Sequence, residues 1–214
     1  MARIIPANSP HTVDEAVAVL SHGGVIIFPT ETVYGIGADL RQPGAIERIF
    51  AIKKRVPERR LLIHCADEVQ LKMAVREIPE QARALITAFL PGPLALILER
   101  SVAVPDIVTA GGKTVGVRIV ASPLFYAICT RLGAPLAATS ANLSGNAATN
   151  NFTAIERKIV ELSDLSIDAG ISGSGIPSTI VDLTTTPPVI RRQGEISKTQ
   201  VQAVLNKFNT DIQF

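Results

Sequence analysis

The sequence has few aromatic side chains, few cysteines and almost no net charge. Aromatic residues make up 4% of the 214 residues and tryptophan is missing, so few rings are present to stack on unpaired bases. The two cysteines, Cys65 and Cys129, lie apart in apolar runs, which argues against a disulfide framework or a zinc ribbon and favours a reducing compartment. A net charge of +2 lacks the basic excess of a dedicated nucleic-acid coat protein.

Membrane spans, metal-ligand spacings and several catalytic motifs are missing as well. No segment reaches the roughly 18 uninterrupted apolar residues of a membrane span, and residues 1–10 lack the apolar core of a signal peptide. His11, His22 and His64 are scattered, so we expect no metal site from protein side chains alone. P-loop, GxSxG, HExxH and GxGxxG patterns do not occur in the required contexts. We therefore expect a cytoplasmic protein that has no membrane contact and is neither a serine hydrolase, a zinc protease nor a dinucleotide dehydrogenase.

The apolar residues follow helix and strand periodicity in turn along the chain. With 47% hydrophobic content the chain can bury one substantial core, so we expect a single domain over residues 1–214 with a core at about 8–198. Strands are expected at 24–28, 61–64, 94–98, 114–120, 136–138, 178–183 and 189–192, and helices at 13–20, 46–53, 79–89, 124–132, 155–162 and 198–208. Thr12 and Glu15 predict a capping box for the first helix. The pattern predicts an α/β or α+β fold with helices covering a sheet.

A loop rich in hydroxyl groups follows the first long strand. It carries Thr30, Thr32 and Tyr34, while Gly35 and Gly37 would permit close backbone approach to a ligand. Open α/β sheets bind ligands at the carboxyl ends of their strands, which favours a ligand-binding role. From this segment alone, a hydrogen-bonded turn remains an equal alternative.

Basic side chains are concentrated in one short segment. Lys53, Lys54, Arg55, Arg59 and Arg60 fall within eight positions, at and beyond the end of a predicted helix. An ammonium group beside forked guanidinium groups suits a polyphosphate, or a phosphate beside a carboxylate. A solvated surface, or cations compensating the dipole at a helix C-terminus, is the alternative for part of the cluster.

Three further features are candidates for a site. Strand alternation turns Arg118 away from the apolar face that carries Val115, Val117 and Ile119. The small polar segment 138–145 follows a predicted strand and could hold a phosphate or nucleobase. Residues 170–177, rich in glycine and serine, predict a flexible loop beside a site. His64, taken alone, is more typical of a structural imidazole than of a catalytic group.

Taken together, these segments resemble the YrdC family of threonylcarbamoyl-adenylate synthases. The matching stretches occur in the family's order at 24–37, 53–55 with His64, 91–94, 114–118, 139–145, 178–182 and 190–197. The resemblance implies a short, single-domain form with a twisted, mixed sheet around a positively charged concave pocket. It also implies a nucleotidyltransferase that makes threonylcarbamoyl-AMP and pyrophosphate from L-threonine, bicarbonate or CO2, and ATP with Mg2+. The product would serve t6A modification at position 37 of tRNA through downstream threonylcarbamoyltransferase proteins.

The resemblance also implies residue roles. The residues implied to surround threonine are Thr32, His64, Arg118, Ser140 and Ser178. Those implied to face ATP are Lys53, Arg55, Arg59, Thr114, Asn142, Asn150 and Arg192, and the catalytic charges would be Lys53, Arg55 and Arg118.

The chain departs from the family pattern in the basic segment. Lys54, Val56 and Arg60 replace a glycine and two prolines, and Arg59 stands where asparagine is frequent, so the ATP role of Arg59 depends on a mobile loop. Two alternatives remain open. One is an RNA-binding module that holds double-stranded RNA or tRNA through its phosphates, and the other is a carbamoyl-transfer paralogue without synthase activity.

Overall fold

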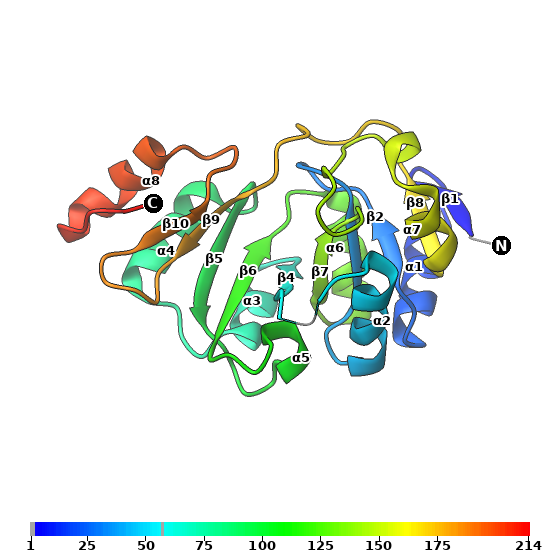
Figure 1. Cartoon of the computed structure of the whole chain (residues 1–214), viewed down its shortest axis with the longest axis horizontal. Helices are drawn as coiled ribbons and strands as arrows, with labels where there is room; N and C mark the ends of the chain where they lie inside the picture. Colours follow the sequence, from blue (N-terminus) through cyan, green and yellow to red (C-terminus); the bar gives the residue numbers. More distant parts are fainter. Residues whose placement is uncertain (1–2, 57) are drawn as a thin grey trace.

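The computed structural model describes residues 3–56 and 58–214 and is built on one ten-stranded sheet (Figure 1). The strands are β1 (Ile4–Pro6), β2 (Ile26–Phe28), β3 (Gly35–Asp39), β4 (Leu62–Cys65), β5 (Leu94–Glu99), β6 (Thr114–Ile119), β7 (Leu136–Ser140), β8 (Leu165–Asp168), β9 (Thr179–Asp182) and β10 (Val189–Arg192). Their order in the sheet is β1-β8-β2-β3-β7-β4-β6-β5-β9-β10. Because β4 pairs parallel with β6 but antiparallel with β7, the sheet is mixed, which confirms the predicted fold class.

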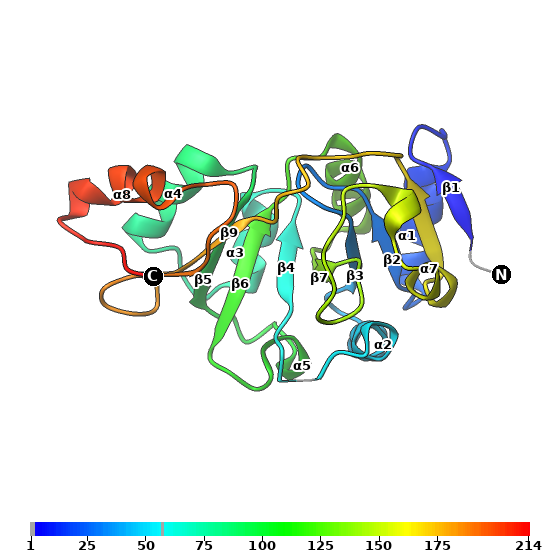
Figure 2. The same cartoon turned by 45° about the horizontal axis from the view of Figure 1, so that its top comes forward.

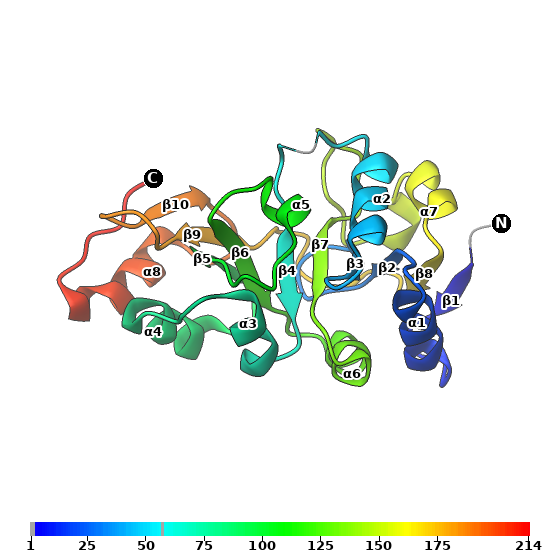
Figure 3. The same ribbon diagram turned by 90° about the horizontal axis from the view of Figure 1, so that it is seen from below.

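Helices cover both faces of this sheet. They are α1 (Thr12–Ser21), α2 (Pro43–Lys53), α3 (Glu68–Ala74), α4 (Glu80–Phe89), α5 (Asp106–Thr109), α6 (Pro123–Leu132), α7 (Arg157–Leu162) and α8 (Lys198–Leu205), with 3-10 turns η1 (Phe152–Ala154) and η2 (Asn206–Phe208). Figure 3 shows α1, α3, α4 and α6 on one side of the sheet and α2, α5 and α7 on the other. None of the helices in the described part of the chain has the length and apolar character that crossing a bilayer requires.

Two hydrophobic clusters hold these layers together. In the smaller one, Ala16 and Leu20 of α1 pack with Phe125 and Ile128 of α6 against the sheet. The larger one buries the apolar stripe of α2 together with residues of α3 and α4. The helical spacing of apolar residues in the sequence therefore marks the faces that are buried.

The start of α1 differs from its prediction. Helix α1 begins at Thr12 itself, after the N-cap residue His11, and no side chain caps it, so the predicted capping box is wrong. The Thr12 hydroxyl donates instead to the carbonyl of Pro6 at 2.7 Å, which ties the helix to the end of β1. This tertiary contact replaces the local one.

Strand β3 was not expected, because its sequence is mostly small residues and suggested a ligand loop. It pairs antiparallel with β2 and β7, and the loop after β2 is confined to residues 29–34. A Cβ on Gly35 would lie 2.7 Å from Cζ of Phe28, and one on Gly37 would lie 3.0 Å from Cε1 of the same ring. These glycines therefore accommodate the Phe28 ring inside the sheet.

The connection from β8 to β9 crosses most of the sheet. These strands occupy the second and ninth places in the sheet order, and residues 169–178 join them. The connection, which we call the strap, bends at Gly170, Gly173 and Gly175, each of which has a positive φ. Figure 2 shows it passing over the central strands.

Candidate active site

A cavity of about 370 Å3 opens among the central strands and the loops that follow them. Four guanidinium groups line it, those of Arg55, Arg60, Arg118 and Arg192, and its lining contains no aspartate or glutamate among the described residues. Hydroxyl and amide groups from the loops after β2 and β7 complete the wall. The cavity therefore offers hydrogen-bond donors and cations to a ligand.

The structure brings most of the predicted site residues to this one cavity. The residues that line it are Thr32, Arg55, His64, Arg118, Ser140, Asn142, Ser178 and Arg192. Four others predicted for the site are not part of the lining: Lys53, Arg59, Thr114 and Asn150. Sequence reasoning did not place Arg60 or Asn146 in the site, although both contribute to the lining.

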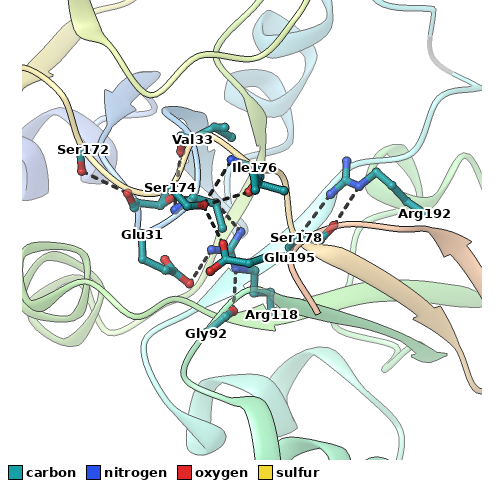
Figure 4. A network of polar contacts seen from close by, with 12 residues as sticks. Glu31, Val33, Gly92, Arg118, Ser172, Ser174, Ile176, Ser178, Arg192 and Glu195 are labelled. Atoms are coloured by element: carbon teal, nitrogen blue, oxygen red, sulfur yellow. Dashed lines mark hydrogen bonds and ion pairs between the residues drawn. The ribbon is translucent and has the colours of Figure 1, made fainter. Parts of the chain in front are cut away.

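Arg118 is held on three sides by other protein groups (Figure 4). Its side chain, on β6, is 3% exposed; Nε donates to the carbonyl of Gly92 and Nη1 donates to Oγ1 of Thr32, each at 3.1 Å. Nη2 lies 2.5 Å from Oε1 of Glu31, although neither Glu31 oxygen has a hydrogen bond in good geometry to a described residue. Glu31 was missed, and the signal was a single carboxylate within a loop of hydroxyl residues. The guanidinium is fixed in place with its charge offset.

His64 is the strand neighbour of Arg118, since the two residues are opposite each other in the β4–β6 pair. Its ring contacts Phe28 and Phe125 edge-on, with centroids 6.2 and 6.3 Å away. Burial, and then the charges of Arg118 and Arg192, lower the pKa of His64 to about 3. The imidazole is therefore neutral at physiological pH and acts through hydrogen bonds and shape rather than charge.

Lys53, which we expected on the phosphates, lies beneath the loop that follows β7. Its side chain is 1% exposed, and Nζ donates to the carbonyl of Ser140 at 2.5 Å and also to that of Asn142. The amide of Ser144 donates back to the Lys53 carbonyl at 3.0 Å. Burial, followed by the charge of Arg55, lowers the pKa of Lys53 to about 8. Lys53 therefore positions this loop from behind and does not reach the cavity.

The other three residues outside the lining hold neighbouring groups. The Arg59 carbonyl accepts from Nε of Arg55 at 2.9 Å, while the Arg59 side chain is exposed. Thr114 accepts through Oγ1 from Nη1 of Arg60 at 2.8 Å. The Asn150 amide donates to the carbonyl of Gly173 in the strap at 3.0 Å. Each one supports the wall without being part of it.

Arg192 links the cavity to the start of β9. Its Nε donates to the carbonyl of Ser178 at 2.9 Å, and Nη2 donates to the Ser178 hydroxyl at 3.1 Å. Burial, and then the charge of Arg118, lower the pKa of Arg192. Two guanidinium groups are thus close enough to repel each other, which favours an anion between or beside them.

The strap is bonded to the loop that carries Thr30 and Glu31. The hydroxyl of Ser172 donates to the backbone carbonyl of Thr30 at 3.1 Å, and the backbone amide of Ser174 donates to the backbone carbonyl of Glu31 at 3.0 Å. On its other side, the Ser174 hydroxyl donates to Oε2 of Glu195 at 2.6 Å (Figure 4). The segment predicted as a flexible loop is therefore tied down on both sides.

The described residues contain no group of three or more His, Cys, Asp or Glu side chains that could hold a metal ion. The oxygens that line the cavity belong to hydroxyl, amide and backbone groups. A magnesium ion here would need most of its oxygen ligands from a bound substrate and water.

Comparison with known proteins identifies the family. A family model of Sua5, YciO and YrdC proteins, described as "Telomere recombination", matches residues 18–194. The chain therefore belongs to the Sua5/YciO/YrdC family. A threonylcarbamoyl-AMP synthase of Pyrococcus abyssi is 36% identical over 192 residues, which cover 90% of this chain and 56% of that protein. One of Xanthomonas campestris pv. campestris is 34% identical over 180 residues, covering 82% of this chain and 96% of that protein.

A solved structure is similar over almost the whole chain. The crystal structure of P. abyssi Sua5 complexed with L-threonine superposes with a TM-score of 0.91 at 33% identity, covering 99% of this chain and 62% of that one. This chain thus spans 56–62% of the length of the P. abyssi proteins. The family and the fold are established by these matches.

Proposed function

We propose that this chain is a threonylcarbamoyl-AMP synthase, which joins L-threonine, bicarbonate or CO2, and ATP and releases pyrophosphate. One observation carries the proposal. Arg55, Arg118 and Asn142, far apart in sequence, line a single cavity whose wall, over residues 3–56 and 58–214, has no carboxylate. The names of relatives that match most of this chain support the same activity. We further propose that the enzyme works in the cytoplasm as one unit and that its product goes to a tRNA-modifying partner.

The end of the cavity at Arg118 suits a small amino acid. Threonine carries a carboxylate, an amine and a hydroxyl, and the wall here offers the Arg118 guanidinium, the neutral His64 ring and the hydroxyls of Thr32 and Ser178. We propose that Arg118 orients the carboxylate through its outward N–H groups, while Glu31 keeps the guanidinium in place. His64, with its pKa near 3, is too weak a base to take the proton from an ammonium group.

The end of the cavity at Arg55 suits phosphates. The carbamate, formed when the free amine of threonine adds to CO2 and releases a proton to solvent, is an anion that must approach ATP. Its oxygen forms a bond to the α-phosphorus while the bond to the β-phosphate oxygen breaks, so pyrophosphate leaves with the electron pair. Arg55 and Arg192 would reduce the repulsion between the two anions and hold them in line.

Two further groups would support the reaction without forming bonds to the reactants. Lys53 would keep the backbone of the loop from Ser140 to Asn142 in position for the nucleotide, because its amine binds two carbonyls of that loop. Magnesium would arrive with ATP and offset charge on the triphosphate, since the part of the wall that the structure describes provides no carboxylate ligand.

The proposal is tested by measuring pyrophosphate release from the purified chain. The assay contains ATP, magnesium and bicarbonate, with each of the twenty amino acids added in turn. We expect release with threonine and little with the other amino acids, and we expect it to fall when bicarbonate is removed. Release that is equal for all amino acids, or absent for threonine, contradicts the proposal. Binding of tRNA that weakens steeply with salt, without such release, would favour the RNA-binding alternative.

A further inference from the structure

Arg60 contributes a guanidinium group to the cavity wall at a position where the resemblance to the YrdC family leads one to expect proline. It lies in the loop between α2 and β4 and lines the cavity together with Arg55. A proline there would supply neither charge nor a hydrogen-bond donor. The side chain is therefore an addition to the site of this particular chain.

The arginines of this chain differ in whether a carboxylate pairs with them. The sequence contains fourteen arginines, and ten of them form an ion pair with an aspartate or glutamate. Across residues 3–56 and 58–214, the arginines without such a pair are Arg55, Arg59, Arg60 and Arg192. Three of these four line the cavity. Because guanidinium stays charged at physiological pH, this wall carries positive charge that an anion would balance.

The guanidinium of Arg60 contacts neutral groups. Its Nη1 donates to Oγ1 of Thr114 at 2.8 Å. A Cβ on Gly112 would lie 2.6 Å from Nη2, so the missing side chain at Gly112 leaves the space that the guanidinium occupies. The Arg60 carbonyl also accepts from Nη2 of Arg55 at 2.7 Å, which keeps the two residues together. Arg60 is exposed, and its guanidinium is oriented by the hydrogen bond to Thr114 and the space above Gly112, with no carboxylate of a described residue paired to its charge.

We infer that Arg60 is a polyphosphate ligand that binds, together with Arg55, the phosphates of a nucleoside triphosphate and the pyrophosphate that leaves. Two neighbouring forked donors match oxygens on adjacent phosphate groups. The identity of the anion rests on the proposed function. The unpaired charge of Arg60 and the position of its guanidinium beside Thr114 and Gly112 do not depend on that function.

The test measures binding to the intact folded chain by isothermal titration, with MgATP and, separately, with inorganic pyrophosphate. Arg60→Gln should weaken both by roughly tenfold to a hundredfold, the effect of one charge-assisted contact, and should leave threonine affinity unchanged. Lys113→Gln is the matched control, because it removes an exposed positive charge next to Gly112 that does not line the cavity. We expect less than about a twofold change for this control.

A second variant moves Arg60 without removing it. Gly112→Ala places a methyl group in the space that the Arg60 guanidinium occupies and so displaces it. The substitution should weaken pyrophosphate binding while the charge of the chain is kept. In the Arg60→Gln background the same substitution should add no further loss, because the two changes affect one contact. Thermal unfolding curves confirm that each variant is folded before binding is compared.

The outcomes separate this inference from the proposed function. If Arg60→Gln binds MgATP and pyrophosphate as well as Lys113→Gln does, or if the losses from Arg60→Gln and Gly112→Ala add in full, Arg60 is not a phosphate ligand. If the wild-type protein binds pyrophosphate more tightly than Arg60→Gln does, but releases no pyrophosphate from ATP when threonine is added, the assignment of Arg60 stands and the synthase proposal fails.

Discussion

The two ends of the cavity hold their cations in different ways. Arg118 is buried, bonded to Thr32 and Gly92, and offset by the charge of Glu31. Arg55 and Arg60 are more open and rest on backbone carbonyls and one hydroxyl, with no carboxylate partner among the described residues. The first arrangement suits a small ligand that must bind in one orientation, and the second suits a large polyanion. The difference indicates that selectivity lies at one end and charge compensation at the other.

The largest effect is expected where the cation is most enclosed. Arg118→Ala should lower threonine-dependent pyrophosphate release by several hundredfold, because it removes a preorganised charge and leaves Glu31 without its partner. Steady-state kinetics with varied threonine provide the measurement. Arg76→Ala, which removes an exposed ion pair with Glu99 and does not touch the cavity lining, is the control and should change little. Near-normal turnover in Arg118→Ala would contradict the proposal that threonine binds at Arg118.

At the open end, Arg55→Ala should lower kcat/KM for ATP by about a hundredfold. Threonine affinity should stay close to that of the wild type, because Arg118 is untouched. Lys54→Gln tests whether losing any positive charge in this segment lowers kcat/KM for ATP, since Lys54 is the exposed neighbour of Arg55 and does not line the cavity. Equal losses in the two variants would show that the effect is general electrostatics, and an equal loss of threonine affinity would show that the ends are not separate.

A smaller effect is expected from Lys53, which supports the wall between the two ends. Lys53→Met should lower turnover by about tenfold, because the loop that holds Ser140 and Asn142 loses its anchor and shifts. In the wild type, turnover should fall as pH rises through about 8, where Lys53 loses its proton. Lys53→Met should lack this fall. A pH profile of turnover for both proteins checks the prediction.

The contribution of Lys53 to stability should change with pH in the opposite direction. The pKa of Lys53 is lowered from 10.5 to about 8 by burial, so between these values the unfolded chain holds a proton that the folded protein does not. Lys53 should therefore add a rise in the free energy of unfolding with pH across this window, whereas the buried thiols of Cys65 and Cys129, whose pKa values burial raises, add a fall. Chemical denaturation at pH 8 and pH 10 measures the total change in wild type and in Lys53→Met, and the difference between the two should be a rise that is present only with Lys53. A larger rise in the variant would contradict the buried charge.

The smallest effect is expected at the strap. Glu195→Gln weakens only the contact with Ser174, while the hydrogen bonds that the Ser172 hydroxyl and two strap amides donate to residues 30–32 remain. We expect turnover within about twofold of the wild type and faster amide exchange in residues 172–176. Hydrogen exchange followed by mass spectrometry detects this. A large loss of turnover without faster exchange would mean that Glu195 has a direct role in the site.

Strong periodic signals predicted much of the fold from the sequence. The long buried strands and amphipathic helices, such as β5, β6 and α6, lie where their apolar patterns indicated. The edge strand β1 and the short strand β8 were missed, because they are three and four residues long and depend on pairing with each other. Strand β3 was missed because its glycines suggested a loop, whereas packing against Phe28 requires them.

The sequence indicated which residues line the cavity where motif residues reach it from strand ends, but not where a long side chain could point either way. Lys53 follows the helical stripe of Ile46, Ile49 and Phe50, so periodicity already indicated that it faces inward. Its charge suggested phosphate binding instead. Glu31 was missed because its partner Arg118 is remote in sequence. Arg60 was counted in the basic segment but given no role of its own, because its partner Thr114 is equally remote. Such contacts appear only when the chain is folded.

The central claim is that one cavity binds an amino acid at Arg118 and a triphosphate at Arg55 and Arg60. A crystal structure with L-threonine and a non-hydrolysable ATP analogue tests it most directly. We expect the threonine carboxylate within hydrogen-bond distance of Arg118, and phosphate oxygens within hydrogen-bond distance of both Arg55 and Arg60. A triphosphate bound on another surface, or threonine bound away from Arg118, would contradict the claim.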